Sequence, residues 1–195
     1  PATDKGTFTD VRDGETYHWV RYGNLEWMSD NFRYDCKDDS KSLVFKNVGT
    51  NTPVDVNAFG RLYSYSGAVQ ACPEGWRLPT DDDWKDLERH LGMAASDAEK
   101  REWRGNIAHN MLTTNGDSCD LNLQLGGYYT SHTIMGTTGY RFFSVYAYYW
   151  TATQDTEKGK GYYFFRKLIY NSDQVYRESM EPEAYFLSVR YVRDA

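Results

Sequence analysis

The second half of the sequence gathers tyrosines beside arginine, asparagine and aspartate, a combination that can bind a ligand. Residues 128–176 hold 15 of the 32 aromatic residues of the chain. A tyrosine ring offers apolar area for stacking at a low cost in conformational entropy, and polar neighbours supply directed hydrogen bonds. Core packing is the alternative for these rings, but one small interior cannot hold them all. We therefore expect exposed rings on one side of the domain, among Tyr148, Tyr163, Tyr170 and Tyr176. The candidate ligand-binding residues are Tyr146, Tyr148, Tyr149, Tyr163, Arg166, Tyr170, Asn171, Asp173, Tyr176 and Arg177.

Two groups of oxygen-bearing side chains are candidate metal ligands. Asp81–Asp83 open a predicted helix, where consecutive side chains point about 100° apart and cannot easily converge on one ion. Capping and interaction with the helix dipole are the better interpretation. Asp117, Asp120 and Asn122 carry the oxygen atoms that Ca²⁺ prefers, but their spacing matches no defined calcium loop. We predict no metal and no other cofactor.

Sequence motifs of catalysis are missing. The sequence contains no nucleophile elbow, P-loop, dinucleotide-binding glycine motif or Cys-x-x-Cys, and no ligand pair at helical spacing among His18, His90, His109 and His132. The carboxylate pair of a glycosidase is defined by a distance in three dimensions, so the sequence selects none. We therefore expect a protein that is not an enzyme.

Composition and charge narrow the classes of partner. The chain has 195 residues, 40% of them hydrophobic, which suits a single domain over residues 1–195 with its own core. A net charge of −6 offers no basic footprint for phosphates, so nucleic acid and anionic membrane surfaces are not expected partners. No apolar run approaches the roughly 20 residues that span a bilayer. The start at Pro1, without a signal-peptide pattern, is compatible with a trimmed or mature form.

Two helices are predicted before the aromatic region. Residues 65–72 have helical spacing of small and apolar residues, and Pro73 ends that helix. Thr80 is a good N-cap for a second helix from about Asp81 to Leu91. Its apolar face consists of Trp84, Leu87 and Leu91. We expect a further turn or two in residues 96–103 and another in residues 107–112.

The remaining segments have the patterns of strands and of one long loop. Residues 16–22 follow a hairpin turn signal at Asp13-Gly14, and residues 35 to about 57 are polar enough for a surface loop. Leu121, Leu123 and Leu125 alternate with polar residues, which predicts a half-buried strand. Further strands are expected at residues 146–153, 162–170 and 185–193, the last with Leu187, Val189 and Tyr191 inward and Ser188, Arg190 and Val192 outward. The expected fold class is α+β.

Motifs along nearly the whole chain carry a family resemblance. They include Gly60-Arg61-Leu62-Tyr63, Cys72-Pro73-Glu74-Gly75-Trp76-Arg77-Leu78-Pro79-Thr80, Gly126-Gly127-Tyr128, Tyr149-Trp150-Thr151-Ala152-Thr153 and Ser188-Val189-Arg190-Tyr191-Val192-Arg193-Asp194. In order and spacing they resemble the Fibrobacter succinogenes major paralogous domain of bacterial surface lipoproteins. The resemblance implies a C-type-lectin-like fold, in which two early helices pack on small antiparallel β-sheets and long loops present the ligand face.

The same resemblance carries expectations about location and packing. It implies a place at the bacterial cell surface, with membrane contact only through a lipid anchor removed from this form. Trp76, Trp84 and Trp150 occupy family-matched positions and are expected to be buried anchors. Family members usually carry Cys where this chain has Tyr191, so a bridge from Cys72 to the last strand is lost. We expect Cys72 to be free or paired with Cys36.

A second, more distant similarity is to the formylglycine-generating sulfatase-activating enzymes, on the Arg77-Leu78-Pro79-Thr80 and Trp84 pattern. Those enzymes use a C-terminal cysteine pair with copper, and this chain has no Cys after Cys119. The leading hypothesis is therefore a non-catalytic binding or adhesion domain at the cell surface, with a glycan or a protein as ligand. The alternatives are an enzyme on the formylglycine-generating scaffold and a structural module of a surface assembly, and the aromatic region would also suit a target of retroelement diversification.

Overall fold

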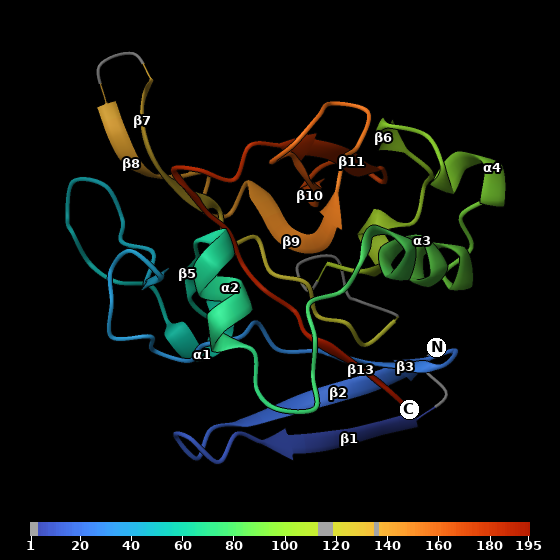
Figure 1. Ribbon diagram of the computed structural model, residues 1–195, viewed down its shortest axis with the longest axis horizontal. Helices are drawn as coiled ribbons and strands as arrows, with labels where there is room; N and C mark the ends of the chain where they lie inside the picture. The colour runs from blue at the N-terminus through green and yellow to red at the C-terminus, as the bar shows by residue number, and fades with distance from the viewer. Residues whose placement is uncertain (1–3, 113–118, 135–136) are drawn as a thin grey trace.

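The computed structural model describes residues 4–112, 119–134 and 137–195, whose short helices and small antiparallel sheets form an α+β fold (Figure 1). The expected fold class is confirmed at this level. Both ends of the chain meet in one sheet with the strand order β1 (Asp4–Thr9), β2 (Thr16–Tyr22), β3 (Leu25–Met28) and β13 (Val192–Asp194). The turn between β1 and β2 contains Gly14 at φ 76°, which glycine adopts without strain. The hairpin predicted at Asp13-Gly14 is confirmed.

A second four-stranded sheet, which we call the central sheet, carries most of the aromatic residues in question. Its strands are antiparallel and lie in the order β6 (Glu102–Arg104), β11 (Val175–Met180), β10 (Tyr163–Ile169) and β9 (Tyr146–Gln154). Lys167 on β10 lies opposite Tyr176 on β11 and Tyr148 on β9, and Tyr176 lies opposite Trp103 on β6. Since paired residues project to the same side of a sheet, these four side chains share one face.

The other face of the central sheet packs against helix α3 (Asp81–His90). Thr80 and Asp83 form a reciprocal capping box at its start, and Leu91 is its C-cap. Trp84 and Leu87 are fully buried against Leu168 of β10, while Leu91 is only partly buried. The predicted helix and its apolar face are therefore confirmed, with Leu91 at the margin.

The other elements are short. A three-stranded sheet has the order β12 (Tyr185–Phe186), β7 (Tyr128–Ile134) and β8 (Thr137–Arg141), and β4 (Ser42–Leu43) pairs with β5 (Leu62–Tyr63). The helices are α1 (Val56–Phe59), α2 (Tyr65–Ala71), α4 (Ala95–Ala98) and a 3-10 turn at Ala108–Asn110. α2 confirms the first predicted helix. Within the described residues, no helix has the length and apolar character of a membrane span.

The strand predicted over Leu121–Leu125 is wrong. The alternation itself is present, because all three leucines are buried and Asn122 between them is exposed. However, Asp120 and Asn122 have φ values of 64° and 51°. Two left-handed residues interrupt an extended ladder, so the segment alternates in burial without pairing as a strand.

The alternation predicted for residues 185–193 is also wrong. Only β12 and the start of β13 fall in this range, and every residue from Leu187 to Val192 is buried, including Ser188 and Arg190. The chain here bridges Tyr63 on one side and Tyr149 on the other. A segment covered on both sides has no face toward solvent, so its residues do not alternate between buried and exposed.

The tryptophan and cysteine expectations hold. Trp76, Trp84 and Trp150 are all buried. Of the two states expected for Cys72, the structure has the free thiol, and Cys36 is also free. Tyr191 fills the position of the absent cysteine as a fully buried ring whose hydroxyl donates to the Ala68 carbonyl.

Candidate ligand-binding site

The ten predicted contact residues divide between the two faces of the central sheet. Alternation along β9 and β10 sends Tyr149 and Arg166 toward α3, together with Arg177 of β11, and all three are buried. The opposite side, which we call the aromatic face, carries Tyr146, Tyr148, Tyr163 and Tyr176. The turn after β10 carries Tyr170, Asn171 and Asp173, all of them exposed.

Arg166 and Arg177 belong to a buried ionic network rather than to a surface. Asp81 Oδ1 lies 2.7 Å from Arg166 Nη1, and Asp81 Oδ2 lies 2.8 Å from Arg177 Nη2. Glu88 accepts from Arg104 at 2.6 Å and from Arg166 at 3.0 Å. Burial alone would raise the pKa of Asp81, but the hydrogen bond from Arg177 and the charge of Arg166 hold it well below its usual value. The prediction that these two arginines contact a ligand is therefore wrong, because both are buried in ion pairs with carboxylates inside the domain.

Tyr149 is likewise part of the interior. Its hydroxyl donates to Asn31 Oδ1 at 2.7 Å, and the same oxygen accepts from Arg190 Nε at 2.7 Å. The Gln124 amide donates to the Tyr149 hydroxyl at 3.1 Å. This ring has no exposed surface, so its predicted contact with a ligand is wrong.

Tyr148 projects to the side of the aromatic face, but neighbouring rings cover it. Only 7% of the residue is exposed, and its ring stacks on Tyr128 with centroids 4.9 Å apart. Burial raises the pKa of the Tyr148 hydroxyl well above its usual value. Tyr163, at the other end of β10, lies against Tyr65 of α2 with ring centroids 4.0 Å apart. Tyr148 is therefore a packing residue of the aromatic face, and the prediction that it contacts a ligand is wrong.

Three partly exposed rings surround the ammonium of Lys167 at the open end of the aromatic face. The distance from Nζ to the ring centroid is 4.0 Å for Tyr176, 5.1 Å for Tyr146 and 5.4 Å for Trp103. These separations are typical of cation–π contacts. Tyr176 and Trp103 also pack edge to face at 5.1 Å. We call Lys167 and these three rings the Lys167 cage. Each strand of the central sheet contributes one of its four residues.

Sequence reasoning found two of the four cage residues and missed the other two. Tyr146 and Tyr176 were predicted, whereas Lys167 and Trp103 were not. Period-two spacing from Tyr163 would have placed Lys167 on the same face. Trp103 carries no such signal, because its place follows from the pairing of β6 with β11.

Of the exposed residues in the turn after β10, Asp173 has a local partner. Its carboxylate lies 3.0 Å from His109 Nδ1, and its carbonyl accepts from the Ala108 amide at 2.9 Å. Tyr170 is 52% exposed. The prediction of an exposed ring therefore holds for Tyr170, while contact between this turn and a ligand stays a prediction.

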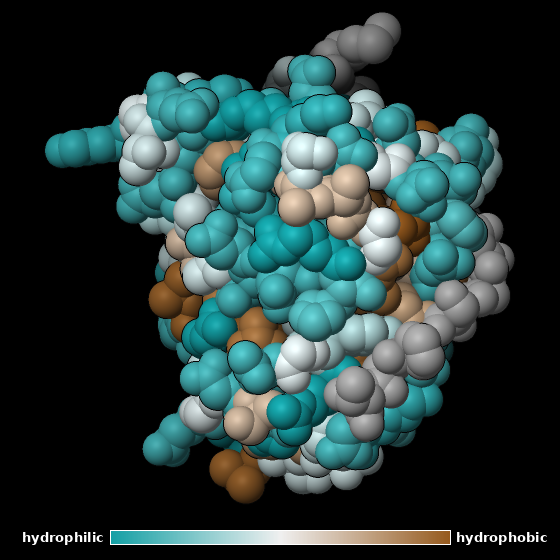
Figure 2. All heavy atoms as spheres, turned by 90° about the vertical axis from the view of Figure 1, so that its right-hand side faces the viewer, coloured by the Kyte–Doolittle hydropathy of each residue, from teal (hydrophilic) through white to brown (hydrophobic). Residues whose placement is uncertain are grey.

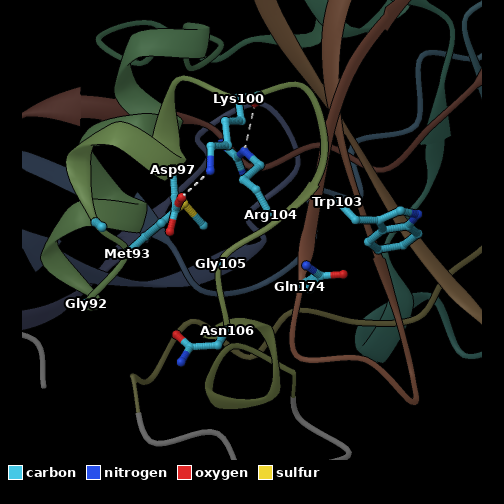
Figure 3. Close-up of a pocket in the computed structure, with 10 residues that line it drawn as sticks. Gly92, Met93, Asp97, Lys100, Trp103, Arg104, Gly105, Asn106 and Gln174 are labelled. Atoms are coloured by element: carbon cyan, nitrogen blue, oxygen red, sulfur yellow. Dashed lines mark hydrogen bonds and ion pairs between the residues drawn. The ribbon is translucent and has the colours of Figure 1, made fainter.

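A cavity of about 490 Å³ adjoins the cage behind β6 (Figure 3). Met93, Asp97, Lys100 and Gly105 line it, and Trp103 forms its side with a ring that points away from them. Lys100 Nζ lies 2.9 Å from the Asp97 carboxylate. The indole thus belongs to the aromatic face, and the cavity is a separate, polar hollow.

The surface on the side of α3 and α4 is mostly hydrophilic, with small separate hydrophobic areas (Figure 2).

The prediction of no metal site involves Asp117, Asp120 and Asn122, and the structure describes only Asp120 and Asn122. In the described ranges, no group of three or more His, Cys, Asp or Glu side chains could hold an ion. Asp120 lies 2.9 Å from the Lys5 ammonium. Asp117 lies outside the described residues.

Comparison with known protein families places the chain. Residues 20–193 match the family model described as the Fibrobacter succinogenes major domain. No curated protein and no solved structure matches the chain. Because the match spans most of the sequence, the chain belongs to the Fibrobacter succinogenes major domain family.

Proposed function

We propose that this chain is a non-catalytic binding domain that holds a glycan against the aromatic face of its central sheet, at the Lys167 cage. The observation that carries the proposal is the arrangement of Trp103, Tyr146 and Tyr176, three partly exposed rings fixed around one ammonium. Rings held in place by a sheet offer apolar faces for stacking without a further loss of side-chain entropy on binding.

The distribution of apolar surface favours a glycan over a protein. A stable protein interface buries about 800 Å² on each partner and has a hydrophobic centre. In the described part of the chain, the exposed large apolar side chains are Val11, Val48, Val69, Phe142 and Tyr170. Of these, Phe142 packs edge to face on Tyr146 of the cage, with ring centroids 5.2 Å apart. A few rings with polar neighbours suit a smaller ligand with many hydroxyl groups.

The state of the carboxyl groups offers no candidate for a carboxylic general acid among the described residues with a shifted pKa. A general acid at neutral pH needs a carboxyl group with a raised pKa. Among the described residues, the carboxyl groups with a shifted pKa are all shifted downward: Asp10, Asp38, Asp81, Glu99, Asp155 and Glu178. The formylglycine-generating reaction lacks its cysteine pair, because no Cys follows Cys119.

We also propose that the domain lies at the cell surface and has a C-type-lectin-like fold. The resemblance to surface lipoproteins supports both proposals.

A glycan array probed with the purified domain tests the proposal. Trp103→Ala and Tyr176→Ala should each weaken binding by about 5-fold or more, the equivalent of 1 kcal/mol. Trp19→Ala is the matched control, because Trp19 is a partly exposed indole on β2, in the sheet that contains both ends of the chain. Thermal unfolding of each variant separates lost binding from lost folding. Binding to proteins on a parallel array, with no glycan bound, would favour the adhesion alternative, and equal losses for all three variants would exclude the cage as the site.

A further inference from the structure

We infer that the glycan is acidic, with a sugar carboxylate that binds the ammonium of Lys167 while the sugar ring stacks on the cage. This inference rests on the proposed function and adds the chemical class of the ligand. It starts from the state of one side chain, the cation at the centre of three rings.

Lys167 has no carboxylate partner among the described residues, in contrast to Lys85 and Lys158. Lys85 lies 2.9 Å from Glu99 and 3.3 Å from Asp82, and Lys158 lies 3.2 Å from Glu178. Within the described ranges, Lys167 makes no ion pair and no hydrogen bond through Nζ, and its contacts are the three ring faces. The cage therefore holds a positive charge for which the described part of the chain supplies no counter-ion.

The ring faces satisfy only part of what an ammonium requires. They attract the charge through their quadrupoles, but they lack the lone pairs that accept the three N–H donors of lysine. Burial lowers the pKa of Lys167, and no neighbouring carboxylate opposes that shift. A ligand carboxylate would supply both the acceptor and the opposite charge, in a hydrogen bond stronger than one from a neutral hydroxyl.

The spacing of the cage suits an acidic sugar in particular. A uronic acid carries its carboxylate directly on the pyranose ring, so stacking and charge pairing occur within one sugar unit. Nζ lies 4.0 Å from the centroid of Tyr176 and 5.4 Å from that of Trp103. Because the ammonium lies over these ring faces, a sugar ring that packs on the cage beside it has its substituents within reach of Nζ.

Two carboxylates near the cage set the limits of this selectivity. Charges on Glu178 and Glu102 contribute to the raised pKa of the Tyr176 hydroxyl, after burial as the main cause. Glu178 is neutralised by Arg101 at 2.8 Å and Lys158 at 3.2 Å, whereas Glu102 is exposed. One cation beside one exposed carboxylate favours a single carboxylate over a densely charged polymer, and binding should weaken as salt is added.

Oligogalacturonate and its fully methyl-esterified form provide a matched pair of probes, because they share the sugar and differ in charge. Binding is measured by calorimetry for the unchanged domain, Lys167→Gln, Lys167→Arg and Lys100→Gln. Lys100 is the control, since it is an exposed lysine beside the neighbouring cavity and is paired with Asp97. An array of neutral, uronate and sulfated oligosaccharides accompanies the two probes.

We expect oligogalacturonate to bind at least about 10-fold more tightly than its ester. Lys167→Gln should abolish that difference, Lys167→Arg should retain most of it, and Lys100→Gln should leave it unchanged. Binding of neutral glycans that depends on Trp103 but not on Lys167 would overturn the acidic ligand and leave the proposed function standing. Preference for sulfated over carboxylated sugars would also overturn it. Failure of every glycan class to bind would remove both proposals together.

Discussion

The buried carboxylate of Asp81 gives a direct test of what fixes the central sheet to helix α3. Only 3% of Asp81 is exposed, and its oxygens accept from Arg166 and Arg177. Replacement of Asp81 by Asn removes the charge and leaves both guanidinium groups buried. Arg166 keeps its ion pair with Glu88, so among the described residues the charge left without a carboxylate is that of Arg177.

The expected loss of stability is large relative to what the domain possesses. Removal of one partner from a buried ion pair costs about 3–5 kcal/mol, since the remaining charge stays without compensation. Domains are stable by about 5–15 kcal/mol in total. With a urea dependence of about 2–3 kcal/mol per molar, the midpoint of unfolding for Asp81→Asn should fall by roughly 1–2.5 M.

Asp82→Asn is the matched control. Asp82 lies in the same first turn of α3, so both variants lose a similar interaction with the helix dipole. Its side chain is 90% exposed, and its contact with Lys85 should contribute little. Urea unfolding at pH 7, followed by tryptophan fluorescence, compares the two variants. Equal midpoints would refute the reasoning, because burial and the ion pairs with Arg166 and Arg177 distinguish Asp81 from Asp82.

Four further predictions concern the core, acid stability, thiol reactivity and catalysis. Trp84→Ala should lower the free energy of unfolding by about 3–5 kcal/mol, and an unchanged urea midpoint would contradict its place in the core. Hydrogen bonds from Arg101 lower the pKa of Asp155 to about 2. This lies below the unfolded value of about 3.9, so the folded state binds fewer protons and stability should fall as the pH drops from about 4 to 2. Asp155→Asn should flatten that decline in acid titrations of stability, and an unaltered slope would count against the assignment. Burial raises the pKa of the Cys72 thiol to about 12, so iodoacetamide at pH 8 should alkylate Cys72 slowly in the native protein and rapidly in urea, as mass spectrometry can measure. Equal rates would show an accessible thiolate. Finally, incubation with sulfatase-type cysteine peptides, with or without copper, should yield no aldehyde by mass spectrometry, and any aldehyde would restore the enzyme alternative.

Local signals were sufficient for helices α2 and α3 and for the burial of the apolar residues Trp84 and Leu87 in α3. Thr80, the acidic first turn and the spacing of Trp84 and Leu87 lie within a dozen residues, so the sequence predicts α3 almost to its last residue. The leucines at 121–125 were assigned correctly to the interior for the same reason. Strand pairing was not predictable there, because the backbone angles of Asp120 and Asn122 are set by the surrounding structure.

The site divides in the same way. A tyrosine-rich stretch with arginines suits a contact surface and also suits a core with buried ion pairs. Arg166 and Lys167 are neighbours in the sequence, yet one is fully buried against Asp81 and the other lies in the cage. Only the position of α3 decides between them, and that position depends on residues far away in the sequence. Trp103 shows the same limit, since it joins the cage through a pairing that spans more than seventy residues.

These neighbouring residues connect stability with binding. On β10 and β11, Arg166 and Arg177 point inward to Asp81, while Lys167 and Tyr176 point outward to the cage. Ion pairs on one face of the sheet therefore hold the backbone that places the rings on the other face. A surface whose rings are already in place loses less conformational entropy when a ligand arrives. The two arginines would then contribute to binding through the sheet, by positioning the cage, without touching the ligand.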